Sequence, residues 1–436
     1  MSLSDIALLG IGIFLVLMFF RMPIGLSLVL AGFTGVALIR GLSAALFNIG
    51  TVVYSTATTQ YLTVIPLFLL MGTLAGEGGI SKDAFDSIHK WVGRLPGGLA
   101  MACVCACAAF GAVCGSHGAT AATMMKAAYP QMKRHQFDDT LSLSSISSGG
   151  TLGFMIPPSG AFIIYGFVTM TPIGSLFIGG ILPGLLLTVM FCIQIYIQCI
   201  MNPRLGPLGP KVSWMERIKA IPGLLPILII FLAVMGGIYS GFVTPTEAAS
   251  IGAFATLLVG LIKRQLTWRG YVTSFFDTVK STAMIFLLLI GAMVFNVFLT
   301  TTEVTLSLGT VIQSWNVDRF VVMWAVLLVF LVAGCFMEGN AVVLVTVPIV
   351  WPVLQSLGFD PVHFGVLIVL TVMIGALTPP FGVVVYLIHG MAPQVPLFTL
   401  FRGCYPFVAT MIICLAILVY FPEISIFLPG MMIPYK

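Results

Sequence analysis

The hydrophobic residues of this chain form long runs that are separated by short polar segments. Runs such as 224–235 and 284–294 contain no polar side chain. A helix needs roughly 20 apolar residues to cross a bilayer, and inside lipid the backbone must satisfy its own hydrogen bonds. The strands of a membrane barrel would alternate polar and apolar residues, which these runs do not. The pattern therefore predicts an all-α polytopic membrane protein.

The hydrophobic runs predict about ten transmembrane crossings. Two stretches between them, 41–58 and 263–280, are too weakly apolar to span. The second alternates aromatic with charged residues, which is typical of an amphipathic helix lying flat at the interface. The run 6–20 lacks the flanks of a cleaved signal peptide, so we expect it to remain as the first span. The expected crossings are 5–20, 23–39, 59–76, 139–169, 172–200, 219–239, 245–262, 281–300, 362–388 and 397–420.

The composition excludes a soluble fold. Of the 436 residues, 59% are hydrophobic and 8% are charged, and the mean hydropathy is +1.12. The formal net charge of +5 comes from basic residues in short loops, so we expect no nucleic-acid partner. The nine cysteines lie mostly in apolar runs, which favours buried thiols over disulfides or a metal site. No Gly-rich, Lys-terminated nucleotide-binding loop is present, so we expect no ATP coupling within the chain.

One sequence module occurs twice, 222 positions apart. Pro157 and Pro158 match Pro379 and Pro380, and the glycines and polar residues around them match at the same offset. The repeats are predicted at 1–201 and 219–436, joined by a cytoplasmic linker at 202–218 that is rich in proline and glycine. Weakly similar halves that interrupt a membrane helix at matching positions are typical of secondary transporters, which bind substrate near the membrane midplane.

The basic residues predict the orientation of the loops. They cluster at 82–94, 126–134, 204–219 and 263–280, all of which we expect in the cytoplasm by the positive-inside rule. The stretch 99–130 begins and ends on that side although it is long enough for two helical legs, so we predict a re-entrant hairpin with its tip near residues 115–118. The repeat places a second hairpin at 321–352, flanked by acidic residues and therefore periplasmic. The two repeats would then have inverted topology, with both termini periplasmic.

The predicted breaks lie in the helices 139–169 and 362–388. A broken helix exposes carbonyls at one half-helix end and amides at the other, so a cation and an anionic group can bind without charged side chains. Serines and glycines crowd the first break, and hydroxyl and carbonyl oxygens suit a hard cation such as sodium. The alternative is that these prolines and serines only kink the helices and satisfy their own backbone. The recurrence of the break beside a polar hairpin tip favours a functional site.

Three further polar residues have competing explanations. Glu338 lies at the second hairpin tip, where an acid either binds a ligand or caps a helical leg. His117 at the first tip either titrates with function or sits solvated in a turn of small residues, and the second is the expected case. Glu247, three residues after Thr244, has the spacing of a capping box, so we expect a structural role for it.

Several motifs together resemble the large membrane subunit of the tripartite ATP-independent periplasmic (TRAP) transporters, over about residues 20–410. They are Ile65-Pro66-Leu67-Phe68, Gly115-Ser116 with Ala119-Thr120, Ile156-Pro157-Pro158-Ser159, Leu182-Pro183-Gly184, Thr244-Pro245-Thr246-Glu247, Asp360-Pro361 with His363-Phe364-Gly365, and Gly375 with Thr378-Pro379-Pro380. Each motif alone is weak, and the combination is specific. The His117-Gly118 pair departs from the small or hydroxyl residues that the family pattern leads us to expect.

The resemblance implies a bacterial inner-membrane importer of small organic acids, driven by sodium and working by an elevator mechanism. It implies two protein partners, a small four-helix membrane subunit and a periplasmic substrate-binding protein, and no cofactor besides the coupling ion. The family's sodium sites correspond here to Gly115, Ser116, Gly339, Asn340, Thr378 and Pro379. We expect substrate contacts at His117, Pro158, Ser159 and Glu338.

The sequence alone also allows other functions. The runner-up is a stand-alone sodium-dicarboxylate symporter or antiporter of the same superfamily, which would transport without a binding protein. A channel needs a continuous hydrophilic path, and the polar residues here gather chiefly at the predicted breaks. A membrane enzyme needs clustered acids, histidines or a nucleophile with its base, and the five histidines are scattered, so we expect no catalytic activity.

Overall fold

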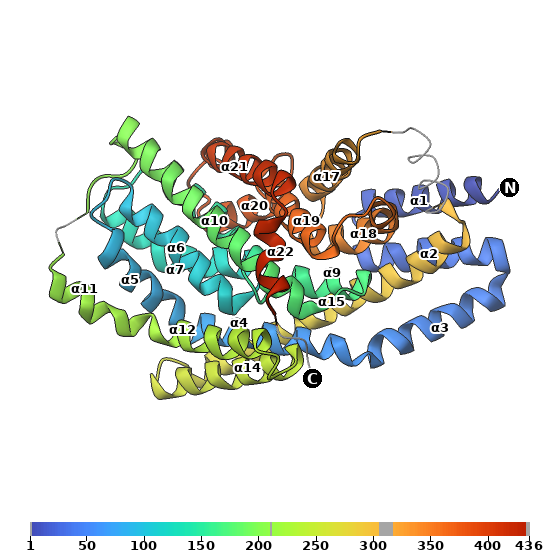
Figure 1. Ribbon diagram of the computed structural model, residues 1–436, viewed down its shortest axis with the longest axis horizontal. Helices are drawn as coiled ribbons and strands as arrows, with labels where there is room; N and C mark the ends of the chain where they lie inside the picture. Colours follow the sequence, from blue (N-terminus) through green and yellow to red (C-terminus); the bar gives the residue numbers. More distant parts are fainter. Residues whose placement is uncertain (1, 210–211, 305–316, 433–436) are drawn as a thin grey trace.

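The computed structural model describes residues 2–209, 212–304 and 317–432, and every regular element in these ranges is a helix (Figure 1). One group of helices, here called the framework, lies mainly along the lower and right-hand parts of Figure 1. It consists of α1 (Leu3–Phe19), α2 (Ile24–Arg40), α3 (Leu42–Thr58), α4 (Val64–Glu77), α12 (Leu225–Phe231), α13 (Gly237–Tyr239), α14 (Pro245–Ile262) and α15 (Trp268–Thr301).

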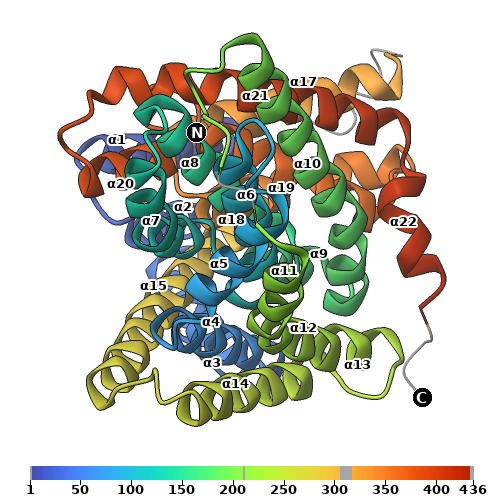
Figure 2. The same cartoon turned by 90° about the vertical axis from the view of Figure 1, so that its left-hand side faces the viewer.

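The second group, here called the hairpin group, packs on the framework through α4, α12 and α15. In Figure 2, α6, α18 and α19 lie in the middle of the molecule, with α14 along the lower edge and α21 along the upper edge. The group consists of α6 (Gly98–Cys114), α7 (His117–Arg134), α8 (Asp139–Met155), α9 (Gly160–Thr169), α10 (Ile173–Met201), α17 (Arg319–Phe336), α18 (Gly339–Ser356), α19 (Pro361–Gly375), α20 (Val383–Met391), α21 (Leu397–Tyr420) and α22 (Glu423–Gly430).

The 222-residue offset of the sequence also relates the helix boundaries. Helix α7 begins at His117 and ends at Arg134, and α18 begins and ends 222 residues later, at Gly339 and Ser356. The pairs α6 and α17, α8 and α19, α9 and α20, and α10 and α21 correspond to within three residues at each end. The duplicated sequence thus folds into duplicated elements.

The described residues contain eight helices that are long and apolar enough to cross a membrane, or up to nine when a bent pair at 214–239 counts as one span. Six of them match predicted crossings, and the bent pair matches a seventh. Helices α1 and α2, at 17 residues each, and α19, at 15 residues, are apolar but shorter. Both legs of the second predicted hairpin, α17 and α18, satisfy the length criterion, so length alone does not distinguish a hairpin leg from a crossing.

The prediction of a separate interfacial helix at 263–280 is wrong. From Trp268 onward these residues are the first half of α15, a continuous helix of 34 residues. At 1.5 Å per residue this helix is about 51 Å long. In the first repeat, by contrast, α3 ends at Thr58 and the turn η1 (Gln60–Thr63) separates it from α4. Pro66 stands near the start of α4, whereas its counterpart in α15 is Leu288, which does not interrupt the helix.

The linker between the repeats is hydrogen-bonded to the base of the first hairpin, just before α6 and just after α7. The amide of Asp138 donates to the carbonyl of Leu205 at 3.1 Å, and the amide of Gly97 donates to the carbonyl of Gly206 at 3.3 Å. Part of the predicted linker is helical, because Ser213 and Glu216 form a capping box that starts α11 (Trp214–Ala220). Helix α11 packs on the short amphipathic helix α5 (Ile80–Val92) and leads through the turn η2 (Ile221–Gly223) to α12, while a π-helical turn, η3 (Leu232–Gly236), joins α12 to α13.

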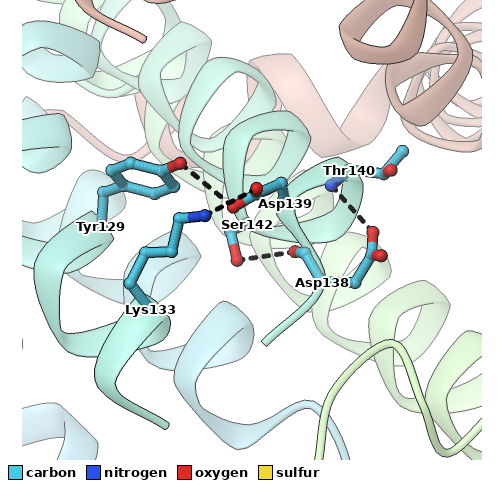
Figure 3. A network of polar contacts seen from close by, with 6 residues as sticks. All are labelled: Tyr129, Lys133, Asp138, Asp139, Thr140 and Ser142. Atoms are coloured by element: carbon cyan, nitrogen blue, oxygen red, sulfur yellow. Dashed lines mark hydrogen bonds and ion pairs between the residues drawn. The ribbon is translucent and has the colours of Figure 1, made fainter. Parts of the chain in front are cut away.

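A polar network fixes the return leg of the first hairpin to the start of α8 (Figure 3). Asp139 in the first turn of α8 accepts from the Tyr129 hydroxyl at 3.0 Å and from the Lys133 ammonium at 2.7 Å, and both donors lie on α7. The neighbouring Asp138 caps α8 by accepting from the amide of Thr140 at 2.8 Å. The network therefore holds α7 and α8 together at the end opposite the hairpin tip.

Candidate functional site

The first break separates α8 from α9 at residues 156–159, all of which are buried. Proline lacks an amide hydrogen, so Pro157 and Pro158 cannot donate to the carbonyls of Gly153 and Phe154 one turn earlier. The Ser159 hydroxyl replaces one of these donors by binding the carbonyl of Phe154 at 2.6 Å. The two prolines thus remove two backbone amide donors from the helix, and the Ser159 hydroxyl replaces only one of them.

The tip of the first hairpin lies on this break. Gly115 follows the last residue of α6 and has a φ of +65°, which favours glycine. Its carbonyl accepts from the amide of Gly160 at 3.3 Å. A Cβ on Gly115 would collide with the carbonyl oxygen of Pro158. Ser116 caps α7 by accepting from the amide of Ala119 at 3.4 Å. The first tip and the first break, with Gly115, Ser116, Pro158 and Ser159, therefore lie side by side.

His117 is buried, so the expectation of a solvated imidazole is wrong. Only 7% of its surface is exposed, and its ring packs edge-on against Phe154 at 4.7 Å between centroids. Phe154 also approaches the second hairpin, because one of its ring carbons lies 2.9 Å from the position of a Cβ on Gly339. This one aromatic ring, in the last turn of α8, therefore contacts both hairpin tips.

Thr120 is a site residue that the functional analysis of the sequence did not single out. It is fully buried, and its hydroxyl has no hydrogen-bond partner among the described residues. Both this hydroxyl and the Ser116 carbonyl oxygen contact the position of a Cβ on Gly153, the oxygen of Ser116 at 3.0 Å. The available signal was its spacing of one helical turn from Ser116. These oxygens and the freed Gly153 carbonyl offer the ligand type that a hard cation prefers.

The tip of the second hairpin is acidic, and Glu338 does cap α18. Its carboxylate accepts from the amide of Asn340 at 3.0 Å and from the Asn340 side-chain nitrogen at 3.0 Å. The remaining Asn340 oxygen, Oδ1, is buried and has no partner in the described part of the chain. The position of a Cβ on Gly160 is 4.0 Å from this oxygen and 3.8 Å from the Gly115 carbonyl oxygen. The second tip therefore faces the first break and the first tip across one glycine.

The second break, between α19 and α20, is more completely bonded and more exposed than the first. The Thr378 amide binds the Gly375 carbonyl at 3.1 Å, and the Val384 amide binds the Ala376 carbonyl at 3.2 Å, which compensates for Pro379 and Pro380. The Thr378 hydroxyl donates to the carbonyl of Ile374 at 2.7 Å. Pro379, Pro380 and Phe381 are exposed, and Phe381 packs on Phe336 of α17 at 5.7 Å. Thr378 and Pro379 thus lie at the second break, beside α17 of the second hairpin, and not at the first break.

A small cavity of about 20 Å³ lies where the first tip meets the framework. This volume holds one particle of the size of water. Gly115, Pro158 and Gly160 supply the main-chain side, and the framework supplies Ile65, Phe68 and Ile285. The framework wall of this cavity carries no charged or hydroxyl side chain.

Most of the serines before the first break satisfy their own helix. The hydroxyls of Ser144, Ser145, Ser147 and Thr151 each donate to a carbonyl three or four residues earlier in α8. The alternative explanation, that such hydroxyls satisfy their own backbone, is therefore correct for these three serines and for Thr151. Ser148 differs, since its buried hydroxyl has no partner among the described residues. The capping box predicted around Glu247 is confirmed, because Glu247 and Thr244 exchange side-chain to amide bonds at the start of α14.

Comparison with known proteins connects this geometry to a family. The model of the family described as "Tripartite ATP-independent periplasmic transporter, DctM component" matches residues 11–424. The chain belongs to this family. It is thus a multi-pass membrane permease of a tripartite system, in a family of secondary transporters of organic acids, and the resemblance drawn from the motifs is confirmed.

Three relatives show the range of the large permeases. The chain is 33% identical to the C4-dicarboxylate TRAP transporter large permease protein DctM of Pseudomonas aeruginosa, over 86% of this chain and 88% of that one. It is 33% identical to the ectoine TRAP transporter large permease protein TeaC of Halomonas elongata, over 84% and 86%. It is 29% identical to the isethionate TRAP transporter permease protein DctMQ of Oleidesulfovibrio alaskensis, over 96% of this chain and 66% of that one.

A solved structure shares the fold at low identity. The YdaH transporter of Alcanivorax borkumensis superposes with a TM-score of 0.66 at 14% identity, over 88% of this chain and 89% of that one. At this identity the likeness concerns the fold alone. It agrees with the all-helical architecture described above.

Proposed function

We propose that this permease imports a small organic acid, a carboxylate, by symport with sodium across the bacterial inner membrane. A periplasmic binding protein delivers the substrate, and a small four-helix membrane subunit accompanies the chain. The observation that carries the proposal is the convergence of two hairpin tips on the first helix break around Phe154 and Gly160. Such a junction supplies main-chain oxygens and amides inside a buried region, where they bind ions and acids without charged side chains.

The proposed sodium sites lie at the tips and breaks. Around the first break, the candidate ligands are main-chain oxygens of Gly115 and Ser116 together with the hydroxyl of Thr120. At the second tip and break they come from the main chain of Gly339, Asn340 and Pro379 and from Thr378. The proposed substrate contacts are His117, Pro158, Ser159 and Glu338, which border the same junction. Oxygen ligands from carbonyls and hydroxyls fit a hard monovalent cation better than a softer metal.

The transport step we propose is an elevator movement of the hairpin group past the framework. The apolar framework wall at Ile65, Phe68 and Ile285 supports this, because a wall that forms no hydrogen bonds to the tip can be left without losing polar contacts. The duplicated helix boundaries support two repeats, which extend over 1–201 and 219–436 in this proposal and are inverted relative to each other. The difference between a buried first break and an exposed second break fits a site that opens to one side at a time.

The fused name of the DctMQ relative supports a small membrane subunit as a partner of this chain. The alternative function is a stand-alone sodium symporter or antiporter. A requirement of uptake for the binding protein distinguishes the proposed function from this alternative.

The experiment that tests the proposal is uptake into proteoliposomes containing this chain and its small subunit, with and without a binding protein and a sodium gradient. We expect uptake only with both. The variants Ser116→Ala and Thr378→Val should lower the apparent sodium affinity, because the first removes the cap that positions the carbonyls of the first tip and the second removes a hydroxyl at the second break. Ser250→Ala on an exposed face of α14 is the control. Sodium-independent uptake, or wild-type sodium affinity in both site variants, would contradict the proposal.

A further inference from the structure

The two hairpin tips have opposite chemistry. At the first tip a neutral hydroxyl, that of Ser116, caps α7 through a single long bond of 3.4 Å. At the second tip the equivalent residue is Glu338, whose carboxylate occupies the start of α18. Helix amides that already bind a carboxylate of the protein cannot also bind one of a ligand. An acid group of the substrate would meet the Glu338 carboxylate at the second tip, whereas residues 115–118 of the first tip include no acid, so the first tip is the more favourable place for it.

The side chains of the second tip, those of Glu338 and Asn340, offer a ligand hydrogen-bond acceptors. The Asn340 side-chain nitrogen is committed to Glu338, which turns its oxygen Oδ1 away from the carboxylate. The reverse orientation would place two acceptors against each other. This oxygen is buried, and no described residue donates to it, although it lies close to Gly160 at the junction of the tips. A group that approaches here must therefore bring a donor.

Glu338 has no basic partner in the described part of the chain. The ion pairs found there join Lys133 to Asp139 and Lys263 to Asp83, and neither includes Glu338. Glu338 as a whole is partly buried. A carboxylate within a membrane protein is costly unless a cation or a donor compensates it, and a second carboxylate placed nearby adds repulsion.

We propose that the substrate carries one acid group and, at its other end, a cationic nitrogen that binds Glu338 and Asn340, and that dicarboxylates are disfavoured. This inference rests on the proposed function, since it assigns the chemistry of the substrate at the same junction. The ammonium or amidinium hydrogens fill the acceptor positions of the second tip. The single carboxylate binds at the amides of the first tip.

A series of four-carbon compounds tests this proposal without knowledge of the natural substrate. We would measure the sodium-dependent thermal stabilisation of the full chain in lipid nanodiscs by 4-aminobutyrate, butyrate and succinate. These share a backbone and differ in carrying a carboxylate with an ammonium, a carboxylate alone, or two carboxylates. We expect 4-aminobutyrate to bind about tenfold more tightly than succinate, which corresponds to one favourable charge pair.

The variant Glu338→Gln should reduce this ratio to about threefold or less, mostly by tighter binding of succinate, because the repulsion is gone. Glu338→Asp should keep the wild-type order, and Asn340→Asp should weaken succinate further. Glu247→Gln removes a capping glutamate of the framework and serves as the matched control, with no change in the order.

Two results would overturn the proposal. One is a wild-type response that is equal for the three compounds, or absent for all, while sodium alone still stabilises the protein. The other is a Glu338→Gln variant that loses its sodium response but keeps the wild-type order, which would make Glu338 a sodium ligand. In both cases the proposed sodium-coupled function stands. If sodium stabilises neither the free nor the ligand-bound wild type, the proposed function fails instead.

Discussion

The contact between Gly115 and Pro158 allows a sharp test of the first tip, through the substitution Gly115→Ala. The new Cβ has two separate costs. An L-residue at a φ of +65° costs roughly 1–2 kcal/mol in any conformation that keeps this backbone. The Cβ also collides with the carbonyl of Pro158, and overpacking of this kind costs about 1–3 kcal/mol, but only while the tip rests on the break.

These two costs have different consequences for sodium binding. The backbone strain is present whether or not the tip is docked, so it lowers stability and leaves the ion affinity unchanged. The steric cost penalises only the docked conformation, which the proposed sodium site requires. A penalty of about 1–3 kcal/mol on the binding-competent state lowers the apparent affinity by about 5- to 150-fold.

The chain offers a control for the strain alone. Gly358 has a φ of +78°, and a Cβ on it would meet nothing within 4 Å. Gly358→Ala should therefore lose thermal stability and keep wild-type sodium affinity. The assay is the sodium concentration for half-maximal thermal stabilisation in nanodiscs. Wild-type sodium affinity in Gly115→Ala, or an equal loss in Gly358→Ala, would refute the link between tip docking and ion binding.

Three further predictions concern topology, pH and packing. Cysteines introduced at Lys82 and Val317, both exposed, should react with a membrane-impermeant maleimide from opposite faces, and labelling from one face would contradict the inverted arrangement. Burial, aided by the nearby positive groups His135 and Lys90, lowers the pKa of His89, so stability should be full above the unfolded-state pKa and fall as the pH drops below it. The melting temperature of His89→Phe should fall less than that of wild type between pH 8 and pH 5.5, and an unchanged fall would refute this role. Phe154→Ala should lower the free energy of unfolding by about 3–5 kcal/mol, because the ring is buried between both tips. The measurement is the melting temperature, and only a small drop would show that the packing of the tips does not depend on this ring.

The sequence predicts the helices and their duplication well because both depend on local signals. Hydrophobic runs give the helices, prolines give the breaks, and the 222-residue offset transfers each boundary from one repeat to the other. The error at 263–280 has the same origin. A helix continues through a polar stretch when nothing interrupts it, and the polar residues of α15 form contacts with α4, such as that between the hydroxyls of Thr278 and Thr73 at 3.0 Å. That contact is not visible in the pattern of one segment.

The site was predictable in outline and not in detail. Glycines, prolines and small polar residues mark the tips and breaks by their spacing. The environment of His117 depends on Phe154, which lies 37 positions away in the chain and is brought to it by the fold. The role of Thr120 depends on an unpaired hydroxyl, and only the structure shows which of several similar hydroxyls are already bonded. Glu338 illustrates a further limit, because the two explanations the sequence left open are compatible, and the observed cap determines what the tip can bind.

The packing of the two repeats explains how one event at a tip can reach the other. The return leg of the first hairpin, α7, packs on α20 of the second repeat, and the return leg of the second, α18, packs on α9 of the first. Neither tip can move far without disturbing a half-helix of the opposite repeat. Phe154 adds a direct contact, with His117 on one side and Gly339 on the other. The proposed sodium ion, by holding the first tip on its break, would therefore also fix the surface against which the second tip closes, and its binding free energy would then help to order the substrate side of the junction.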